Sequence, residues 1–159
     1  MALWQFTFQP IPRPASGVSP EESWFNFGWE EQAVPEVLLS RLRELLPLHE
    51  TYGAGDDMTL VYGEPSQNEI KVFYRDGRVV GLPIRLDLRS LDTALVRAII
   101  EATVSASAVF VSSEERVFEA DWDAVVAELL SCRAAQFVQD PLGSLKRLAA
   151  SEKAPELPN

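Results

Sequence analysis

The residue types that most often carry catalysis or bind metals are scarce in this sequence. The 159-residue chain has one His and one Cys, and no nucleophile or ligand motif surrounds His49 or Cys132. We therefore expect neither a zinc site built from these side chains nor a Cys/His dyad. Cys132 has no partner for an internal disulfide bond, which favours a reducing compartment. We interpret it as a half-buried helix thiol.

Carboxylates are the other groups that could do chemistry. Residues 53–57, Gly-Ala-Gly-Asp-Asp, resemble a phosphate loop only superficially, because no Lys follows and no helix is expected after them. Asp56 with Asp57, or Asp121 with Asp123, could bind a divalent cation, but neither pair has the spacing of a calcium loop. The sequence thus predicts no catalytic residue, no cofactor and no metal, and we expect a protein that is not an enzyme.

Charge is distributed unevenly along the chain. The sequence has 14 Lys and Arg against 24 Asp and Glu, a formal net charge of -10, which disfavours nucleic-acid binding and suits a basic partner. Residues 21–57 hold nine acids and residues 114–128 hold six, whereas residues 71–97 hold six basic residues and three acids. Two interpretations stay open, a solubilising surface or a binding surface for a cationic protein.

Aromatic residues interrupt the first acidic stretch. Trp24, Phe25, Phe27 and Trp29 lie among glutamates in a segment with little predicted regular structure. Aromatic anchors inside a polar rim are typical of a protein interface, and a lid over the sheet is the alternative. The candidate partner-binding residues are Trp24, Phe25, Trp29, Glu30, Glu31, Asp56, Asp57, Glu114 and Glu115.

The first half of the chain predicts a strand, a helix and a group of strands. Alternation of Trp4, Phe6 and Phe8 with polar residues predicts the opening strand. Pro35 and the leucines after it predict a helix, which Pro47 ends. A loop around residues 53–57 then leads into three predicted strands, which span residues 58–62, 69–74 and 78–89.

Two details of these strands carry structural information. Asp76-Gly77, between the second and third of the three, is typical of a type I′ hairpin turn. Pro83 cannot donate a ladder hydrogen bond, so the third strand is predicted to lie at an edge or to contain a bulge. Arg85, Asp87 and Arg89 share one face of this strand and are predicted to form a charge ladder with a neighbouring strand.

The second half is predicted to be mainly helical. Ser90 is the expected cap of a helix over residues 91–107, and a strand over 108–111 and a loop over 112–121 follow. Asp121 is the expected cap of a helix that reaches Phe137, before a short helix over 142–149. The predicted order is β-α-β-β-β-α-β-α-α, an α+β domain over residues 1–150 with a mostly antiparallel sheet of about five strands and helices on one face. Residues 151–159 are expected to form a flexible tail.

Location follows from what the sequence lacks. No apolar run reaches the length of a membrane span, and polar residues interrupt the N-terminal stretch where a signal peptide would be apolar. We expect a cytoplasmic protein that does not bind membranes.

Several segments between residues 58 and 147 resemble small immunity proteins of bacterial polymorphic-toxin systems. These segments are Val-Tyr-Gly-Glu at 61–64, Asn-Glu-Ile-Lys-Val at 68–72, Ile-Arg-Leu-Asp-Leu-Arg at 84–89, and the run from Ser131 to Pro141. The resemblance implies an acidic, cytoplasmic α+β protein, a monomer or homodimer, that binds a cognate toxin domain and occludes its active or substrate site. It transfers no individual functional residue. An acidic secretion chaperone that holds an effector segment is the alternative function.

Overall fold

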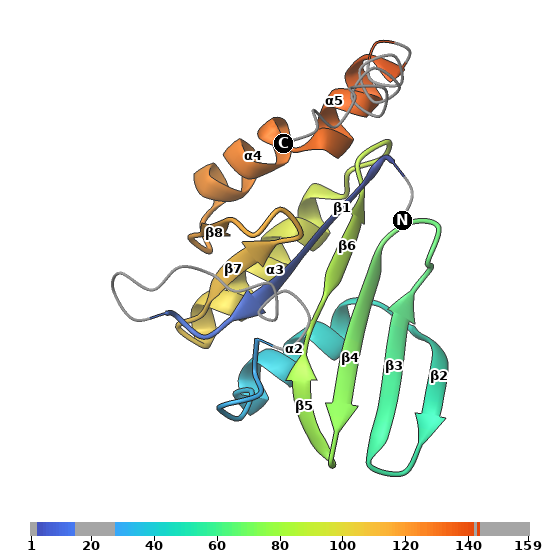
Figure 1. Cartoon of the computed structure of the whole chain (residues 1–159). Coiled ribbons are helices and arrows are strands. Elements are labelled where there is room, and N and C mark those ends of the chain that lie inside the picture. Colours follow the sequence, from blue (N-terminus) through green and yellow to red (C-terminus); the bar gives the residue numbers. More distant parts are fainter. Residues whose placement is uncertain (1–2, 15–27, 142, 144–159) are drawn as a thin grey trace, which may run out of the picture.

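The computed structural model describes residues 3–14, 28–141 and 143 of the chain. In this part the fold is α+β, with eight strands and four helices (Figure 1). The strands are β1 (Gln5–Ile11), β2 (Leu48–Ala54), β3 (Asp57–Gly63), β4 (Glu69–Arg75), β5 (Arg78–Gly81), β6 (Ile84–Asp87), β7 (Val109–Ser112) and β8 (Val117–Phe118). The helices are α2 (Glu36–Leu45), α3 (Thr93–Ser105), α4 (Trp122–Ser131) and α5 (Arg133–Gln139).

All eight strands belong to one antiparallel sheet. Its order is β2-β3-β4-β6-β1-β7-β8, and β5 pairs with β4 beside this path. The opening strand β1 lies inside the sheet, between β6 and β7, where Phe8 is opposite both Ile84 and Ser112. In the described residues, β2 and the short β8 therefore end this path, and β5 has a strand partner on one side only.

The main hydrophobic core joins the helices to one face of the sheet. Strand residues such as Phe8, Ile70 and Ile84 share this core with Leu38 and Leu42 of α2, with Leu95, Val96 and Ile99 of α3, and with Val125 and Leu129 of α4. In Figure 1, α2 and α3 pass behind the strands. Alternation along each strand sends the next residues to the other face, where Ile11, Val109 and Val111 form a small second cluster.

The predicted α+β class and antiparallel sheet are confirmed, but the predicted strand count and order are wrong. The sheet has eight strands rather than about five, and the observed order is β-α-β-β-β-β-β-α-β-β-α-α. Residues 48–54, which fall in the loop predicted around residues 53–57 between Pro47 and the strand at 58–62, form β2, since pairing with β3 supplies their backbone partners. Val117–Phe118 pairs with β7 although two residues carry no periodic signal.

The predicted third strand, residues 78–89, divides at Leu82-Pro83. The chain before the division pairs with the end of β4, and the chain after it pairs with β1 and the start of β4. Gln9 stabilises the division because its Oε1 accepts a hydrogen bond from Leu82 N at 2.8 Å. The predicted Asp-Gly turn is present, with positive φ values of 50° at Asp76 and 72° at Gly77.

Capping residues set the helix boundaries differently from the sequence prediction. Asp92, not Ser90, caps α3, because its Oδ1 accepts from Leu95 N at 3.0 Å. Asp121 caps α4 as predicted, accepting from Ala124 N at 2.8 Å. The helix ends at Ser131 rather than continuing to Phe137, and α5 begins after an extended Cys132.

Among the helices of the described residues, none has the length and apolar character needed to cross a bilayer. The predicted tail, residues 151–159, lies outside the described part of the chain.

Candidate functional site

Three acidic segments that are distant in sequence meet at the turn between β4 and β5. The Glu30 carboxylate pairs with the Arg75 guanidinium. From the β2–β3 turn, Asp57 Oδ1 accepts from Asp76 N at 2.9 Å, and the Asp56 carbonyl accepts from Gly77 N at 2.9 Å. We call the five exposed carboxylate residues of these three segments the acidic corner: Glu30 with its neighbour Glu31, Asp56, Asp57 and Asp76.

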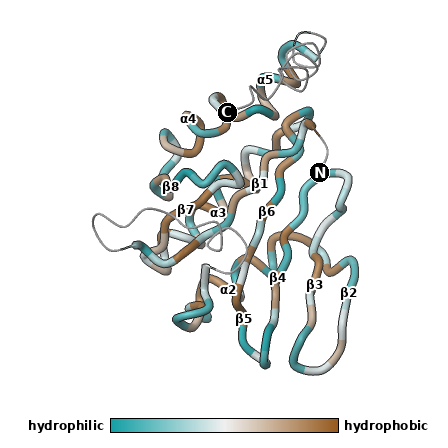
Figure 2. Tube along the Cα trace, in the orientation of Figure 1, coloured by the Kyte–Doolittle hydropathy of each residue, from teal (hydrophilic) through white to brown (hydrophobic). Residues whose placement is uncertain are grey.

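The acidic corner keeps a negative surplus. Arg75 and Arg78 are also exposed on the β4–β5 turn, so five carboxylates share the corner with two guanidinium groups. Figure 2 colours this turn as hydrophilic. Because the two hairpin turns are hydrogen-bonded to each other, the backbone that carries Asp56, Asp57 and Asp76 is ordered before a partner binds, which reduces the entropy lost on binding.

Most cations elsewhere in the described chain are already engaged. Bidentate contacts of 2.6 and 2.7 Å join Arg13 to Glu119, and this pairing lowers the pKa of the Glu119 carboxyl. The buried Glu69 lies 3.3 Å from Lys71 Nζ and 3.4 Å from Arg85 Nη1. The predicted charge ladder of Arg85, Asp87 and Arg89 with a neighbouring strand is thus confirmed only for Arg85, because Asp87 pairs with Arg89 of its own segment.

The candidate aromatic residues have different outcomes. Trp29 is 2% exposed and belongs to the main core. Its Nε1 donates to the Pro10 carbonyl at 2.8 Å, and its backbone N donates to Val80 O at 3.1 Å. Trp29 is therefore a buried residue that stabilises the fold, which agrees with the alternative interpretation, a lid over the sheet. Trp24 and Phe25 lie outside the described residues.

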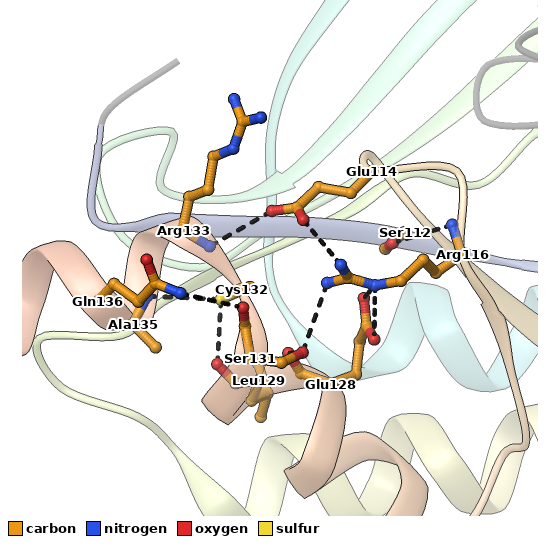
Figure 3. Close-up of polar contacts among 10 residues, drawn as sticks. All are labelled: Ser112, Glu114, Arg116, Glu128, Leu129, Ser131, Cys132, Arg133, Ala135 and Gln136. Atoms are coloured by element: carbon orange, nitrogen blue, oxygen red, sulfur yellow. Dashed lines mark hydrogen bonds and ion pairs between the residues drawn. The ribbon is translucent and has the colours of Figure 1, made fainter. Parts of the chain in front are cut away.

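Glu114 and Glu115 are not part of the acidic corner. They lie in the turn between β7 and β8, toward the sheet edge opposite β2. Glu115 is exposed with a φ of 60°. Glu114 lies 3.0 Å from Arg116 Nη1 and accepts from Arg133 N at 3.3 Å (Figure 3).

Arg116 is the centre of this second polar cluster. Its Nε donates to both carboxylate oxygens of Glu128, at 2.9 and 3.1 Å, and its Nη2 donates to Ser131 Oγ at 3.4 Å (Figure 3). These contacts fasten the β7–β8 turn to the end of α4. Cys132, 1% exposed, lies beside them, and burial raises the pKa of its thiol. A protonated, buried thiol is a poor nucleophile.

A polar depression of about 510 Å³ lies at the end of β6. Its lining is Gln67, Asn68, Asp87, Arg89, Ser90 and Asp92. Asn68 Oδ1 accepts from Asp87 N at 3.0 Å, and Arg89 Nη2 donates to Asp87 Oδ2 at 2.6 Å while its guanidinium lies over the Trp4 ring. Asp92 caps α3. Four of the six lining side chains thus support the local fold.

Within residues 3–14, 28–141 and 143, no three His, Cys, Asp or Glu side chains lie close enough together to hold a metal ion. In the acidic corner, the Glu30 carboxylate contacts the Arg75 guanidinium, and the Asp57 carboxylate accepts from the Asp76 backbone N–H.

Comparison with known proteins gave no match: no family model, no curated protein and no solved structure is similar to this chain. The resemblance to immunity proteins therefore stays a prediction.

Two parts of the site were missed at the sequence level. Asp76 was assigned only to a turn, because nothing in the sequence places that turn beside residues 55–57. Strand β2 was assigned to a loop, and its seven residues are all exposed along the sheet edge. The alternation of Glu50 and Tyr52 with smaller residues was the available signal for a strand.

Proposed function

We propose that this protein is an immunity protein, which binds a cognate, basic toxin domain of a bacterial polymorphic-toxin system in the cytoplasm and occludes its active or substrate site. The observation that carries the proposal is the acidic corner, where Glu30, Asp56 and Asp57 come together from distant segments. Occlusion requires a positioned surface and no catalytic group. The role is accordingly that of an inhibitor and not of an enzyme.

Electrostatics gives the acidic corner a physical role in this function. A surface of one sign steers a partner of the opposite sign and raises the association rate more than it raises affinity. The Asp56 carbonyl and the Asp57 carboxylate are hydrogen-bonded to the β4–β5 turn. The electrostatic field of these groups therefore keeps a fixed direction relative to the fold. A basic groove that binds an anionic substrate would be attracted to this corner.

A secretion chaperone is the second candidate, and one observation favours it. The exposed edge strand β2 could hold an extended effector segment by strand addition. A chaperone would retain its partner when that partner is unfolded, whereas an immunity protein would bind a folded catalytic domain.

The experiment is capture of partners from the native cells with the tagged chain, followed by an activity assay of the captured protein. The immunity function predicts one stoichiometric, folded, basic partner whose toxic activity is lost when the complex forms. The variant E31Q/D56N should lower the association rate about tenfold at low salt, since two steering charges are removed. Moderate salt should reduce the difference between the variant and the wild-type chain.

The matched control is E101Q/D123N, which removes the same charge from exposed residues of α3 and α4. This control should leave the association rate within about twofold of wild type. Equal losses in both double variants would mean that net charge, not the acidic corner, steers the partner. If the captured partner is an unfolded segment without activity, the chaperone function would be favoured over the immunity function.

A further inference from the structure

Strand β2 is an open sheet edge along its whole length. It pairs with β3 on one side, and no other strand of the described residues, 3–14, 28–141 and 143, pairs with it on the other (Figure 1). All seven of its residues are exposed, and Leu48 and Tyr52 are 57% and 52% exposed. A long exposed edge presents unpaired N–H and C=O groups that pair readily with another strand.

The register identifies which backbone groups are open. Ala54 and Asp57 close a two-residue hairpin, and the pairs Gly53/Met58, Tyr52/Thr59, Thr51/Leu60 and Glu50/Val61 follow without a break. In an antiparallel pair, every second residue directs its N–H and C=O away from the partner strand. Counting from the closing pair, Thr51 and Gly53 direct these groups to the open edge. A register shift between Leu48 and Glu50 ends the paired stretch, so Glu50–Ala54 is the usable segment; within it Gly53 has a φ of 80° and departs from extended backbone.

The charges around this segment select its partner. Glu50 lies on the strand itself, and its carboxylate accepts a hydrogen bond from the Tyr52 hydroxyl. Glu64, at one end of the strand, lies 3.5 Å from His49, and Asp56 and Asp57 form the turn at the other end. The nearby Arg43 donates through its Nε to the Tyr62 hydroxyl at 2.8 Å, a neutral partner that leaves the guanidinium charge in place. Carboxylates thus lie on the strand and at both of its ends.

A second copy of this chain fits the edge poorly. Each copy has a net charge of -10, and a symmetric pairing centred on Thr51 would place Glu50 of each copy opposite Tyr52 and diagonal to the other Glu50, on the same face of the joined sheet. Two carboxylates placed in this way repel each other. An extended segment rich in Lys or Arg has the complementary charge.

We propose that β2 is a docking edge for an extended, basic segment of a partner protein, which adds to the sheet as a further antiparallel strand beside Glu50–Ala54. This inference rests on the proposed function, because the segment is taken to be an extended stretch of the folded, basic partner domain; an unfolded segment bound alone at β2 would instead fit the chaperone. Backbone hydrogen bonds to Thr51 and Gly53 supply affinity, and Glu50 supplies the preference for lysine and arginine side chains.

The test measures amide hydrogen exchange at Thr51 and Gly53 in the intact chain. The probe is a capped peptide of alternating lysine and valine, and the matched probes are a glutamate/valine peptide and the lysine peptide with N-methylated backbone. The lysine peptide should slow exchange at both amides about tenfold or more, because exchange then requires dissociation of the added strand. The two matched probes should leave both rates unchanged.

Two protein variants make the readout specific. Thr51→Pro removes an outward N–H without removing a hydrogen bond to β3, and it should abolish the response of Gly53 to the lysine peptide. Glu50→Lys should weaken the lysine peptide about tenfold and allow the glutamate peptide to bind, whereas the control Glu101→Lys on α3 should do neither. The result for Thr51→Pro is interpreted only if the amide signals of β3 and β4 in this variant match those of the wild-type chain. The comparison of the peptides on the wild-type chain tests the proposal independently of this variant.

Three results would overturn the inference. These are unchanged exchange at Thr51 and Gly53 with the lysine peptide, equal protection by the lysine and glutamate peptides, and protection that grows with protein concentration alone, which would identify a second copy as the occupant. The two proposals fail separately. Peptide binding at β2 without a toxin partner would remove the immunity function only, and neutralisation of a toxin by Thr51→Pro at wild-type affinity would remove the docking edge only.

Discussion

The Nε atom of Arg116 donates to both carboxylate oxygens of Glu128, at 2.9 and 3.1 Å. Glu128 is 8% exposed, whereas Arg116 reaches it from the exposed β7–β8 turn. The pair therefore connects a surface turn to a nearly buried carboxylate at the end of α4. Because Arg116 fastens this turn to α4, the Glu114 carboxylate in the same turn also contributes to holding the fold together.

Arg116→Met should lower the free energy of unfolding by about 1–3 kcal/mol, because the Glu128 carboxylate would remain nearly buried without its main donor. Urea denaturation measures the change. Arg133→Met is the control: the Arg133 guanidinium points away from the cluster (Figure 3), so its removal should cost less than about 0.5 kcal/mol. Equal costs for the two variants would contradict a specific role for the Arg116–Glu128 pair.

Trp29→Phe should lower the free energy of unfolding by about 1–3 kcal/mol, since the Pro10 carbonyl loses its indole donor and the core loses volume. The affinity of the folded variant for a captured partner should stay at the wild-type value. Thermal or urea denaturation, together with a binding titration, measures both quantities. Reduced affinity with unchanged stability would instead assign Trp29 to the interface.

Acid should weaken the fold through Asp87. Hydrogen bonds from the Arg89 side chain and backbone hold the pKa of Asp87 below its ordinary value of 3.8. A carboxyl whose pKa is lower in the folded state stabilises the protein above the unfolded-state pKa and loses this contribution as the pH falls through the folded-state pKa.

Asp87→Asn should therefore be less stable than wild type at neutral pH, and the difference should narrow as the pH falls from about 4 to about 2. Urea denaturation at a series of pH values measures the narrowing. Glu119→Gln is the comparison, because the pKa of Glu119 is also lowered by its Arg13 partner but both side chains are 56% exposed. Solvent screening should make its pH effect smaller. A constant difference between Asp87→Asn and wild type would rule out this linkage.

Alanine substitutions at two glycines with similar φ values distinguish the free-energy cost of a steric clash from that of a left-handed backbone. Gly63 has a φ of 79°, and a Cβ there would overlap the Asn68 carbonyl oxygen and lie 2.7 Å from Leu46 Cδ1. Gly55 has a φ of 66°, but a Cβ there would meet no atom within 4 Å. Gly55→Ala should cost about 1 kcal/mol, the price of a left-handed backbone for alanine.

Gly63→Ala should cost at least about 2 kcal/mol more than Gly55→Ala, because the β3–β4 loop must shift as well. Denaturation of the two variants under the same conditions gives the difference. Similar costs would show that the loop containing Asn68 moves freely.

Local pattern determined the class of this fold and several of its details. Period-two alternation located β1, the leucine spacing located α2, and Asp76-Gly77 located a turn whose positive φ values the structure confirms. Asp121 was recognised as a cap because the cap bond joins residues three apart. Each of these features depends on residues that are close in the sequence, so a single sequence contains the information.

Tertiary structure alone decided the sheet edges and the composition of the candidate site. Strand β2 became a strand because β3 supplies its hydrogen-bonding partners. Residues 78–89 divided at Leu82-Pro83, where Gln9 of β1 accepts from Leu82 N and the chain beyond enters the sheet between β4 and β1. Glu30, Asp57 and Asp76 were separate charges in the sequence, and the packing of two hairpin turns brought them together. Such long-range pairing depends on the free energy of the whole sheet, which no local segment encodes.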